Sequence, residues 1–259
     1  MNYNTLLYEL AAGVLTITFN RPERYNAFNS EMSMEFIDAL KKAEKDSTVR
    51  VIVITGSGKA FCSGQDLKDV AGVTRSLGES VEKRYNPKAR LIQTIEKPVI
   101  AKLNGIAAGA GAGVALACDY VIASEQAALL FAFVNIGLVL DTGSSYALPR
   151  LVGYRKAFEY ATLGNKISAT EALECGLVNQ VVMPDKLDES TTVIAQKYAT
   201  SATKAIGLIK RMLQRSVHSS LEETLELEKY CQEIAGKSQD YIEGVSAFIE
   251  KRPPNFSGK

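Results

Sequence analysis

One run of small residues, Ala107 to Asp119 (AAGAGAGVALACD), constrains the fold of this chain more than any other segment. The run is typical of a strand that breaks at glycine and continues as a helix, and the segment Ala60 to Leu67 (AFCSGQDL) has the same character. A helix start leaves backbone N–H groups free, and these groups can hold negative charge. The candidate donors are the amides of Gln65 and Ala110.

Two such donors, brought together, would form an oxyanion hole. The alternative is that the glycines only allow a helix to pack closely. Neither run is a GxGxxG with a downstream ribose carboxylate or a GxxxxGK[ST], so the sequence does not predict nucleotide binding of those types. The donor pair instead predicts an enzyme that stabilises an enolate or a tetrahedral oxyanion.

The composition is that of an ordinary globular protein: 259 residues, 46% of them hydrophobic and 23% charged. With a formal net charge of +1 and no basic stripe, we expect no nucleic-acid partner. The longest apolar tract is too short and too glycine-rich to span a bilayer, and the N-terminus shows no signal-peptide pattern. The four cysteines are widely spaced, as free thiols of a cytoplasmic protein would be.

The chain has one histidine, His218, placed between two predicted helices. A Ser–His–Asp or Cys–His arrangement would have to use that residue, and a metal site with several histidines is impossible. We therefore expect no metal, and we expect acid–base chemistry to fall to a carboxylate, lysine, tyrosine or cysteine.

Short apolar runs alternate with helical patterns along the first 199 residues, which predicts an α/β fold. The stretch 68–86 is polar and weakly periodic, and we interpret it as a loop, which could act as a lid, or as an irregular helix. Residues 200–259 read as two further amphipathic helices, and we expect them to form an appendage to the 1–199 core. The expected strands are Leu6–Leu10, Val14–Phe19, Val51–Thr55, Val99–Leu103 and Tyr120–Ala123, and the expected helices include one capped by Asn29 or Ser30 and one over Leu187–Ala199.

Asp141 stands directly after an apolar run, in the segment IGLVLDTGSS. Burial there would raise the pKa of this carboxyl group and suit it to proton transfer. The alternative is that Asp141 is the N-cap of the following helix, which would lower its pKa. The two roles are compatible, and both stay open at this point.

Several of these segments resemble the crotonase, or enoyl-CoA hydratase/isomerase, family over essentially the whole chain. The matching pieces occur in the family's order: NRPERYNAFN from Asn20, AFCSGQDL, the Asn104-Gly105 turn with AAGAGAGVALACD, IGLVLDTGSSYALPRLVG from Ile136, and EGVSAFIEKRPPNF from Glu243. The resemblance implies a spiral core of ββα repeats, a helical C-terminal trimerisation region, and homotrimers or dimers of trimers. It also implies an acyl-CoA thioester substrate.

Carried over residue by residue, the resemblance places the oxyanion donors on Gln65 and Ala110. It implies an acyl pocket lined by Phe133 and Leu140, and a C-terminal pair, Phe248 and Lys251, that a neighbouring subunit lends to the CoA. The other CoA-contacting positions would be Arg24, Asn26, Ala27, Ala60, Ser63, Asp66 and Leu67.

The chain departs from the family's hydratases at both of their glutamates, which fall on Gly113 and Phe133. Asp141 remains, as in the members that isomerise ring-epoxidised phenylacetyl-CoA to an oxepin and can shift a β,γ double bond to α,β. The family's 4-chlorobenzoyl-CoA dehalogenases also carry an aspartate there, but their histidine base falls near Asn86. The resemblance thus implies an acyl-CoA isomerase with Asp141 as the proton shuttle and no cofactor beyond the CoA of the substrate.

Two other functions stay open: an enoyl-CoA hydratase of fatty-acid β-oxidation, and a non-catalytic scaffold that binds acyl-CoA.

Overall fold

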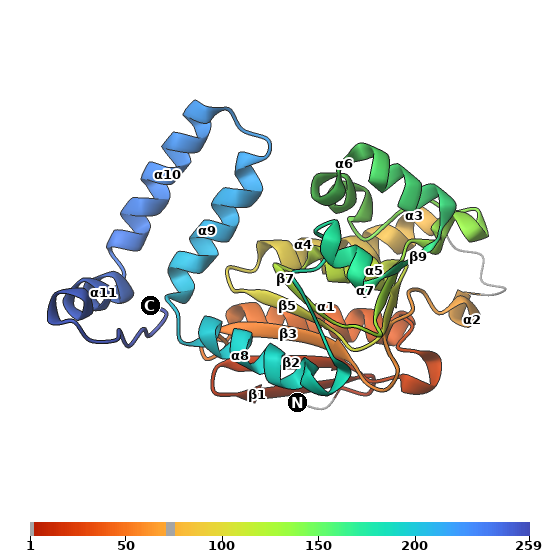
Figure 1. Ribbon diagram of the computed structural model, residues 1–259, viewed down its shortest axis with the longest axis horizontal. Coiled ribbons are helices and arrows are strands. Elements are labelled where there is room, and N and C mark those ends of the chain that lie inside the picture. The colour runs from red at the N-terminus through yellow and green to blue at the C-terminus, as the bar shows by residue number, and fades with distance from the viewer. Residues whose placement is uncertain (1–2, 71–75) are drawn as a thin grey trace.

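The computed structural model describes residues 3–70 and 76–259, and two β-sheets form its α/β core (Figure 1). The larger sheet has the strand order β1-β2-β3-β5-β7-β10. β1 is antiparallel to β2, and the other neighbouring strands are parallel. The strands are β1 (Leu6–Ala11), β2 (Val14–Phe19), β3 (Val51–Gly56), β5 (Val99–Leu103), β7 (Tyr120–Ser124) and β10 (Gln180–Val182).

A smaller sheet is built from the strands that follow those of the larger one. Its order is β4-β6-β8-β9, with β9 antiparallel to β8 and the others parallel. Two strands followed by a helix or helical turn therefore recur along the chain, which confirms the expected spiral of ββα units. The strands are β4 (Ala60–Cys62), β6 (Ile106–Ala108), β8 (Ala128–Leu130) and β9 (Lys166–Ser168).

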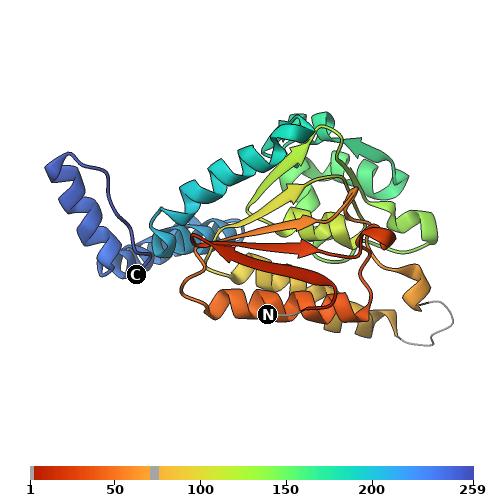
Figure 2. The same ribbon diagram turned by 90° about the horizontal axis from the view of Figure 1, so that it is seen from below.

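Helices cover both faces of the larger sheet (Figure 2). β3 is buried along its whole length, and its alternate side chains point to opposite faces. Val51 and Val53 pack with residues of α8 (Leu187–Ala199), whereas Ile52 and Ile54 belong to the main core shared with α1 (Ser30–Lys45). α1 begins where the sequence predicts, because the Asn29 side chain accepts the Met32 N–H at 2.8 Å.

Within the predicted stretch 68–86, residues 68–70 and 77–86 are helical and Ser76 is an extended helix cap; residues 71–75 lie outside the described ranges. It contains α2 (Leu67–Val70), α3 (Leu77–Ser80) and a π-helical turn, η2 (Val81–Tyr85), which leads into α4 (Asn86–Thr94). An irregular helix, rather than an open loop, therefore describes residues 77–86.

The C-terminal region contains three helices rather than the expected two. Ser238 starts the additional helix, since its hydroxyl accepts the Tyr241 N–H at 3.0 Å only a few residues after the preceding helix ends. The three helices are α9 (Thr203–Ser216), α10 (Leu221–Gly236) and α11 (Gln239–Glu250); before them come α6 (Ser144–Leu163) and α7 (Ala169–Glu174).

α9 is tied to the core, while α10 and α11 extend away from it (Figure 1). The buried Lys210 ammonium on α9 donates to Asp119 at 2.7 Å and to the Ile92 carbonyl at 2.7 Å. The boundary near residue 200 and a role of this region in trimerisation stay predictions. Within the described ranges, none of the helices has the length and apolar character needed to cross a membrane.

Candidate active site

The two segments that carry the candidate N–H donors approach closely, and a glycine in each allows this approach. Gly64 (φ +92°) precedes Gln65, and Gly109 (φ +52°) precedes Ala110, the first residue of α5 (Ala110–Ala117). A Cβ atom added to Gly64 would lie 2.9 Å from the Ala108 oxygen and 3.5 Å from the Ala110 nitrogen. Only glycine fits this approach without strain.

Both N–H groups are available for a ligand. Neither the Gln65 nor the Ala110 N–H donates to a backbone carbonyl within the described residues. For Ala110 this follows from its place at the start of α5, where the first turn has no intrahelical acceptor. Both residues line the same cavity, as an oxyanion hole would require, and the donor pair itself stays a prediction.

This cavity has a volume of about 200 Å³ and is formed by three segments of the chain. They are the turn after β4, the β6–α5 junction, and the segment from the 3₁₀ helix η3 (Ala132–Ile136) to Asp141. Asp141 is the only ionisable side chain among the described lining residues, which are Ser63, Gly64, Gln65, Leu67, Ala108, Gly109, Ala110, Ala132, Phe133, Asn135, Ile136, Leu138 and Asp141.

Asp141 does not cap α6 with its side chain. The helix begins at Ser144 with Gly143 as its N-cap, and only the backbone oxygen of Asp141 takes part, by accepting the Ser144 N–H at 2.9 Å. The Asp141 carboxylate instead accepts the Thr142 hydroxyl at 2.7 Å. The side-chain N-cap alternative is therefore wrong, because left-handed residues at 142 and 143 move the helix start beyond the reach of residue 141.

The pKa of Asp141 is raised above its ordinary value. Burial of the carboxyl group is the main cause, and the Thr142 hydroxyl and the Lys88 charge oppose it. A raised pKa brings the carboxyl group closer to neutrality and makes it a better proton acceptor and donor there.

The backbone that carries Asp141 depends on Gly113 of α5. Thr142 is fully buried and has φ +51°, a left-handed conformation that is strained for a β-branched residue. A Cβ atom on Gly113 would lie 2.7 Å from the Thr142 Cβ and 2.8 Å from the Ser144 Oγ. The Asp141 loop therefore occupies the space that a side chain at 113 would need.

Of the two expected acyl-pocket residues, the structure places one in the cavity. Phe133 lines it, whereas Leu140 packs partly buried against the main core. Leu138 and Ile136 line the cavity nearby. Sequence reasoning missed them, although both lie in the apolar run that it singled out.

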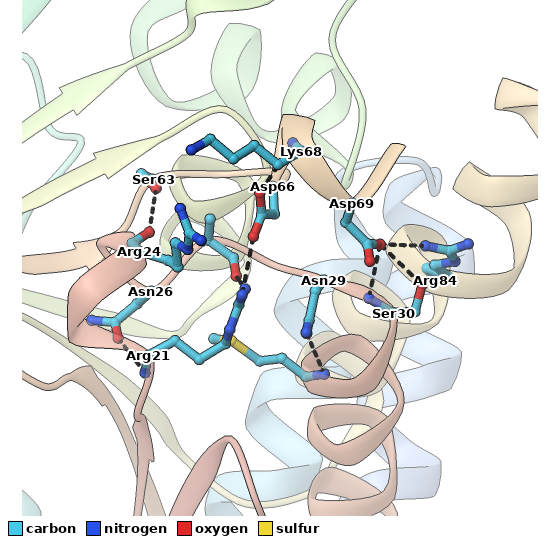
Figure 3. A network of polar contacts seen from close by, with 12 residues as sticks. Arg21, Arg24, Asn26, Asn29, Ser30, Ser63, Asp66, Lys68, Asp69 and Arg84 are labelled. Atoms are coloured by element: carbon cyan, nitrogen blue, oxygen red, sulfur yellow. Dashed lines mark hydrogen bonds and ion pairs between the residues drawn. The ribbon is translucent and has the colours of Figure 1, made fainter. Parts of the chain in front are cut away.

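The expected CoA-contacting positions divide into exposed and buried ones. Arg24 and Leu67 are exposed and Ser63 is half-buried, but Ala27 and Ala60 are buried. Asn26 is fully buried, and its side chain accepts the Arg21 N–H at 2.9 Å (Figure 3). The same side chain donates to the Ser57 and Ala60 carbonyls at 2.8–2.9 Å. The Asn26 side chain thus holds the loop together and is not free to contact a ligand.

Asp66 also stabilises this loop, through an ion pair with Arg21, a residue that the sequence analysis did not single out. Its carboxylate pairs with Arg21 at 3.0 Å and accepts the Lys68 N–H at 3.1 Å (Figure 3). Burial alone would raise the pKa of Asp66, but the Arg21 guanidinium and the Lys68 N–H outweigh it and lower the pKa. Nearby, the Ser30 hydroxyl at the start of α1 donates a hydrogen bond to the Asp69 carboxylate of α2, which ties α2 to the core.

Phe248 and Lys251 lie far from this cavity within one chain. Phe248 is 85% exposed on α11, where it lines a hollow between the C-terminal helices. α11 and α2 stand at opposite ends of the molecule (Figure 1). The pair could reach the cavity only from a second copy, as the sequence predicts, and this contact stays a prediction.

Comparisons with known proteins agree with this architecture. The model of the enoyl-CoA hydratase/isomerase family matches residues 9–259. The "1,2-epoxyphenylacetyl-CoA isomerase" of Escherichia coli is 44% identical over 98% of both chains, and a "Probable enoyl-CoA hydratase" of Rhodobacter capsulatus is 41% identical over 100% of both. The solved structure of a putative enoyl-CoA hydratase/isomerase from Mycobacterium abscessus superposes with a TM-score of 0.93 at 36% identity, covering 98% of this chain and 100% of that one.

A spiral of ββα units, with two candidate backbone donors lining one cavity, is the architecture of an α/β enzyme that acts on a carbonyl group. The chain belongs to the enoyl-CoA hydratase/isomerase family.

Proposed function

We propose that this protein is an acyl-CoA isomerase in which Asp141 moves a proton along the acyl chain. The observation that carries the proposal is that one small cavity is lined by Gln65 and Ala110, whose N–H groups donate to no backbone carbonyl among the described residues, and by Asp141, the one ionisable side chain among its described lining residues. Such a site can stabilise an enolate and transfer one proton, which is what isomerisation needs.

The proposed reaction conserves every atom. With a β,γ-unsaturated acyl thioester, the Asp141 carboxylate takes a proton from the α-carbon, and the electron pair moves toward the thioester oxygen. The Gln65 and Ala110 N–H groups donate to that oxygen, and each such donor typically contributes about 3 kcal/mol. Protonated Asp141 then returns its proton to the γ-carbon, which leaves an α,β double bond.

The similarity to an isomerase of 1,2-epoxyphenylacetyl-CoA supports a substrate whose acyl group carries a six-membered carbon ring. Conversion of the ring epoxide to an oxepin is also an isomerisation, without loss or gain of atoms. The apolar wall around Phe133 and Ile136 suits a ring. The proposal needs no metal or redox cofactor, and coenzyme A enters only as part of the substrate.

An enoyl-CoA hydratase is the second candidate, favoured by the similarity to the Rhodobacter capsulatus protein. Hydration needs acid–base groups that place and activate water. The positions that the hydratase glutamates would occupy hold Gly113 and Phe133, and Gly113 has no room for a side chain. Asp141 alone does not replace both glutamates.

A panel of thioesters tests the proposal: crotonyl-CoA for hydration, a β,γ-enoyl-CoA and ring-epoxidised phenylacetyl-CoA for isomerisation. We expect turnover of at least one isomerisation substrate and slow hydration. Rapid hydration of crotonyl-CoA would favour the hydratase instead. Tight binding with no turnover of any thioester would identify a non-catalytic acyl-CoA scaffold.

We expect Gly113→Glu not to create a hydratase. The new side chain would collide with Thr142 and Ser144, and such overpacking costs about 1–3 kcal/mol. Urea unfolding should show this loss, and crotonyl-CoA hydration should not increase. Gly78→Glu, on the exposed face of α3, is the matched control and should change stability by less than about 0.5 kcal/mol. A fully stable Gly113→Glu variant with rapid hydration would contradict the account of this position.

A further inference from the structure

Lys88 on α4 is a fully buried lysine that the proposed mechanism does not use. Its ammonium donates to the Ser33 hydroxyl of α1 at 3.0 Å and lies 3.4 Å from the centre of the Phe28 ring. The Tyr85 ring of η2 is 4.5 Å away. Within the described residues, no carboxylate forms an ion pair with it. Burying an unpaired ammonium group is costly, so this position calls for an explanation.

The charges around Lys88 identify the group that it affects. The Lys88 ammonium group contacts the uncharged Ser33 hydroxyl of α1 and the ring of Tyr85 in η2. It also interacts electrostatically with Cys62 of β4 and with Asp141 in the loop before α6. Burial raises the pKa of the Cys62 thiol to about 12, which keeps it neutral. Asp141 is therefore the carboxylate that shares this interior with Lys88.

The two elements that carry Lys88 and Asp141 are packed together. A Cβ atom on Gly143 would lie 3.4 Å from the Cβ of Ala89, the residue after Lys88. Lys88 is not among the described residues that line the cavity, so its ammonium group acts on Asp141 from within the protein and does not meet a substrate.

We infer that Lys88 is a positioning residue for Asp141. The Lys88 ammonium group favours the ionised form of the Asp141 carboxyl group and so keeps it ready to accept the substrate's proton. The inference rests on the proposed function. Burial of Asp141 works against ionisation, and the Lys88 charge offsets part of that effect. Burial lowers the pKa of Lys88 itself to about 7, so the charge is present in acid and fades above neutrality.

The variant Lys88→Met tests this inference, because methionine has a similar length and no charge to desolvate. Without the ammonium group, Asp141 should hold its proton to higher pH. The acid limb of kcat/KM for a β,γ-enoyl-CoA should move upward by the same amount. Activity should fall on the acid limb and match the wild type once Asp141 is ionised in both proteins, with KM unchanged.

The titration of Asp141 can also be followed directly by NMR of its carboxyl carbon, which needs no substrate. The matched control is Lys97→Met: Lys97 is half-buried and donates to the Ala43 and Asp46 carbonyls at 2.6 Å, away from the cavity. This control should leave the Asp141 titration unchanged. An unchanged titration in Lys88→Met as well would overturn the inference.

A reciprocal measurement keeps the test independent of how Lys88→Met folds. If the two charges interact, Asp141→Asn must lower the pH at which Lys88 loses its proton. An identical Lys88 titration in wild type and Asp141→Asn would refute the inference. A wild type that isomerises no thioester would instead refute the proposed function, and both NMR titrations would still decide the interaction.

Discussion

Replacing Asp141 with asparagine should reduce isomerisation by about 10²–10⁴-fold, the typical contribution of a general acid–base group. Asparagine has nearly the same shape and can still accept the Thr142 hydroxyl bond, so the loop before α6 should keep its conformation. It cannot take up a proton. Acyl-CoA affinity should therefore stay close to that of the wild type, and the loss should appear in kcat when turnover and equilibrium binding are measured together.

The same variant has a predictable effect on stability. Because burial raises the pKa of Asp141, the folded chain binds this proton more tightly than the unfolded chain does. The contribution of Asp141 to stability should therefore decline as pH rises through the window above the ordinary value of 3.8, and the stability of the wild type relative to Asp141→Asn should fall over that window. Asp185→Asn, an exposed carboxylate on η4 (Pro184–Lys186), is the matched control and should change neither property. Full isomerase activity in Asp141→Asn would exclude the proposed proton transfer.

Long, strongly patterned elements could be predicted from the sequence. The boundaries of β2, β5 and α8 agree with the predicted Val14–Phe19, Val99–Leu103 and Leu187–Ala199. Their patterns repeat over enough residues to identify the element. The short strands β8 and β9 could not be found in this way, because three residues carry no usable period. α11 was missed because its start depends on one capping serine that follows closely after α10.

In the candidate site, too, some residues could be predicted from the sequence and others could not. Gln65 and Ala110 could be predicted because the glycines before them mark positions where the backbone turns unusually. The choice between two roles for Asp141 could not be made from the sequence, because Asp-Thr-Gly-Ser-Ser offers several possible caps. The left-handed conformation of Thr142 decides it, and that conformation depends on the space left by Gly113. Lys88, just after the polar stretch 68–86, could not be singled out, since a buried lysine resembles an exposed one in sequence.

Gly111 of α5 should be among the least replaceable residues of the chain. A Cβ atom there would lie 2.2 Å from the Cys62 oxygen and 2.8 Å from its Cβ, and both belong to the buried strand β4. Gly111→Ala must push α5 away from β4. Overpacking of this kind costs about 1–3 kcal/mol, and the gain of about 1 kcal/mol from alanine's better helix propensity offsets only part of it.

The displacement should also disturb the proposed oxyanion hole, because Ala110 precedes Gly111 and Gln65 follows shortly after Cys62. If one donor is lost, kcat should fall by about 10²–10³-fold, even in the fraction that remains folded. Gly236→Ala is the control: it is also a helical glycine, with nothing within 4 Å of the added Cβ, and it should leave kcat unchanged and stabilise slightly. Urea unfolding and single-turnover kinetics on both variants would separate the two effects. If Gly111→Ala behaved like Gly236→Ala, close contact between α5 and β4 would not be what holds the two N–H groups together.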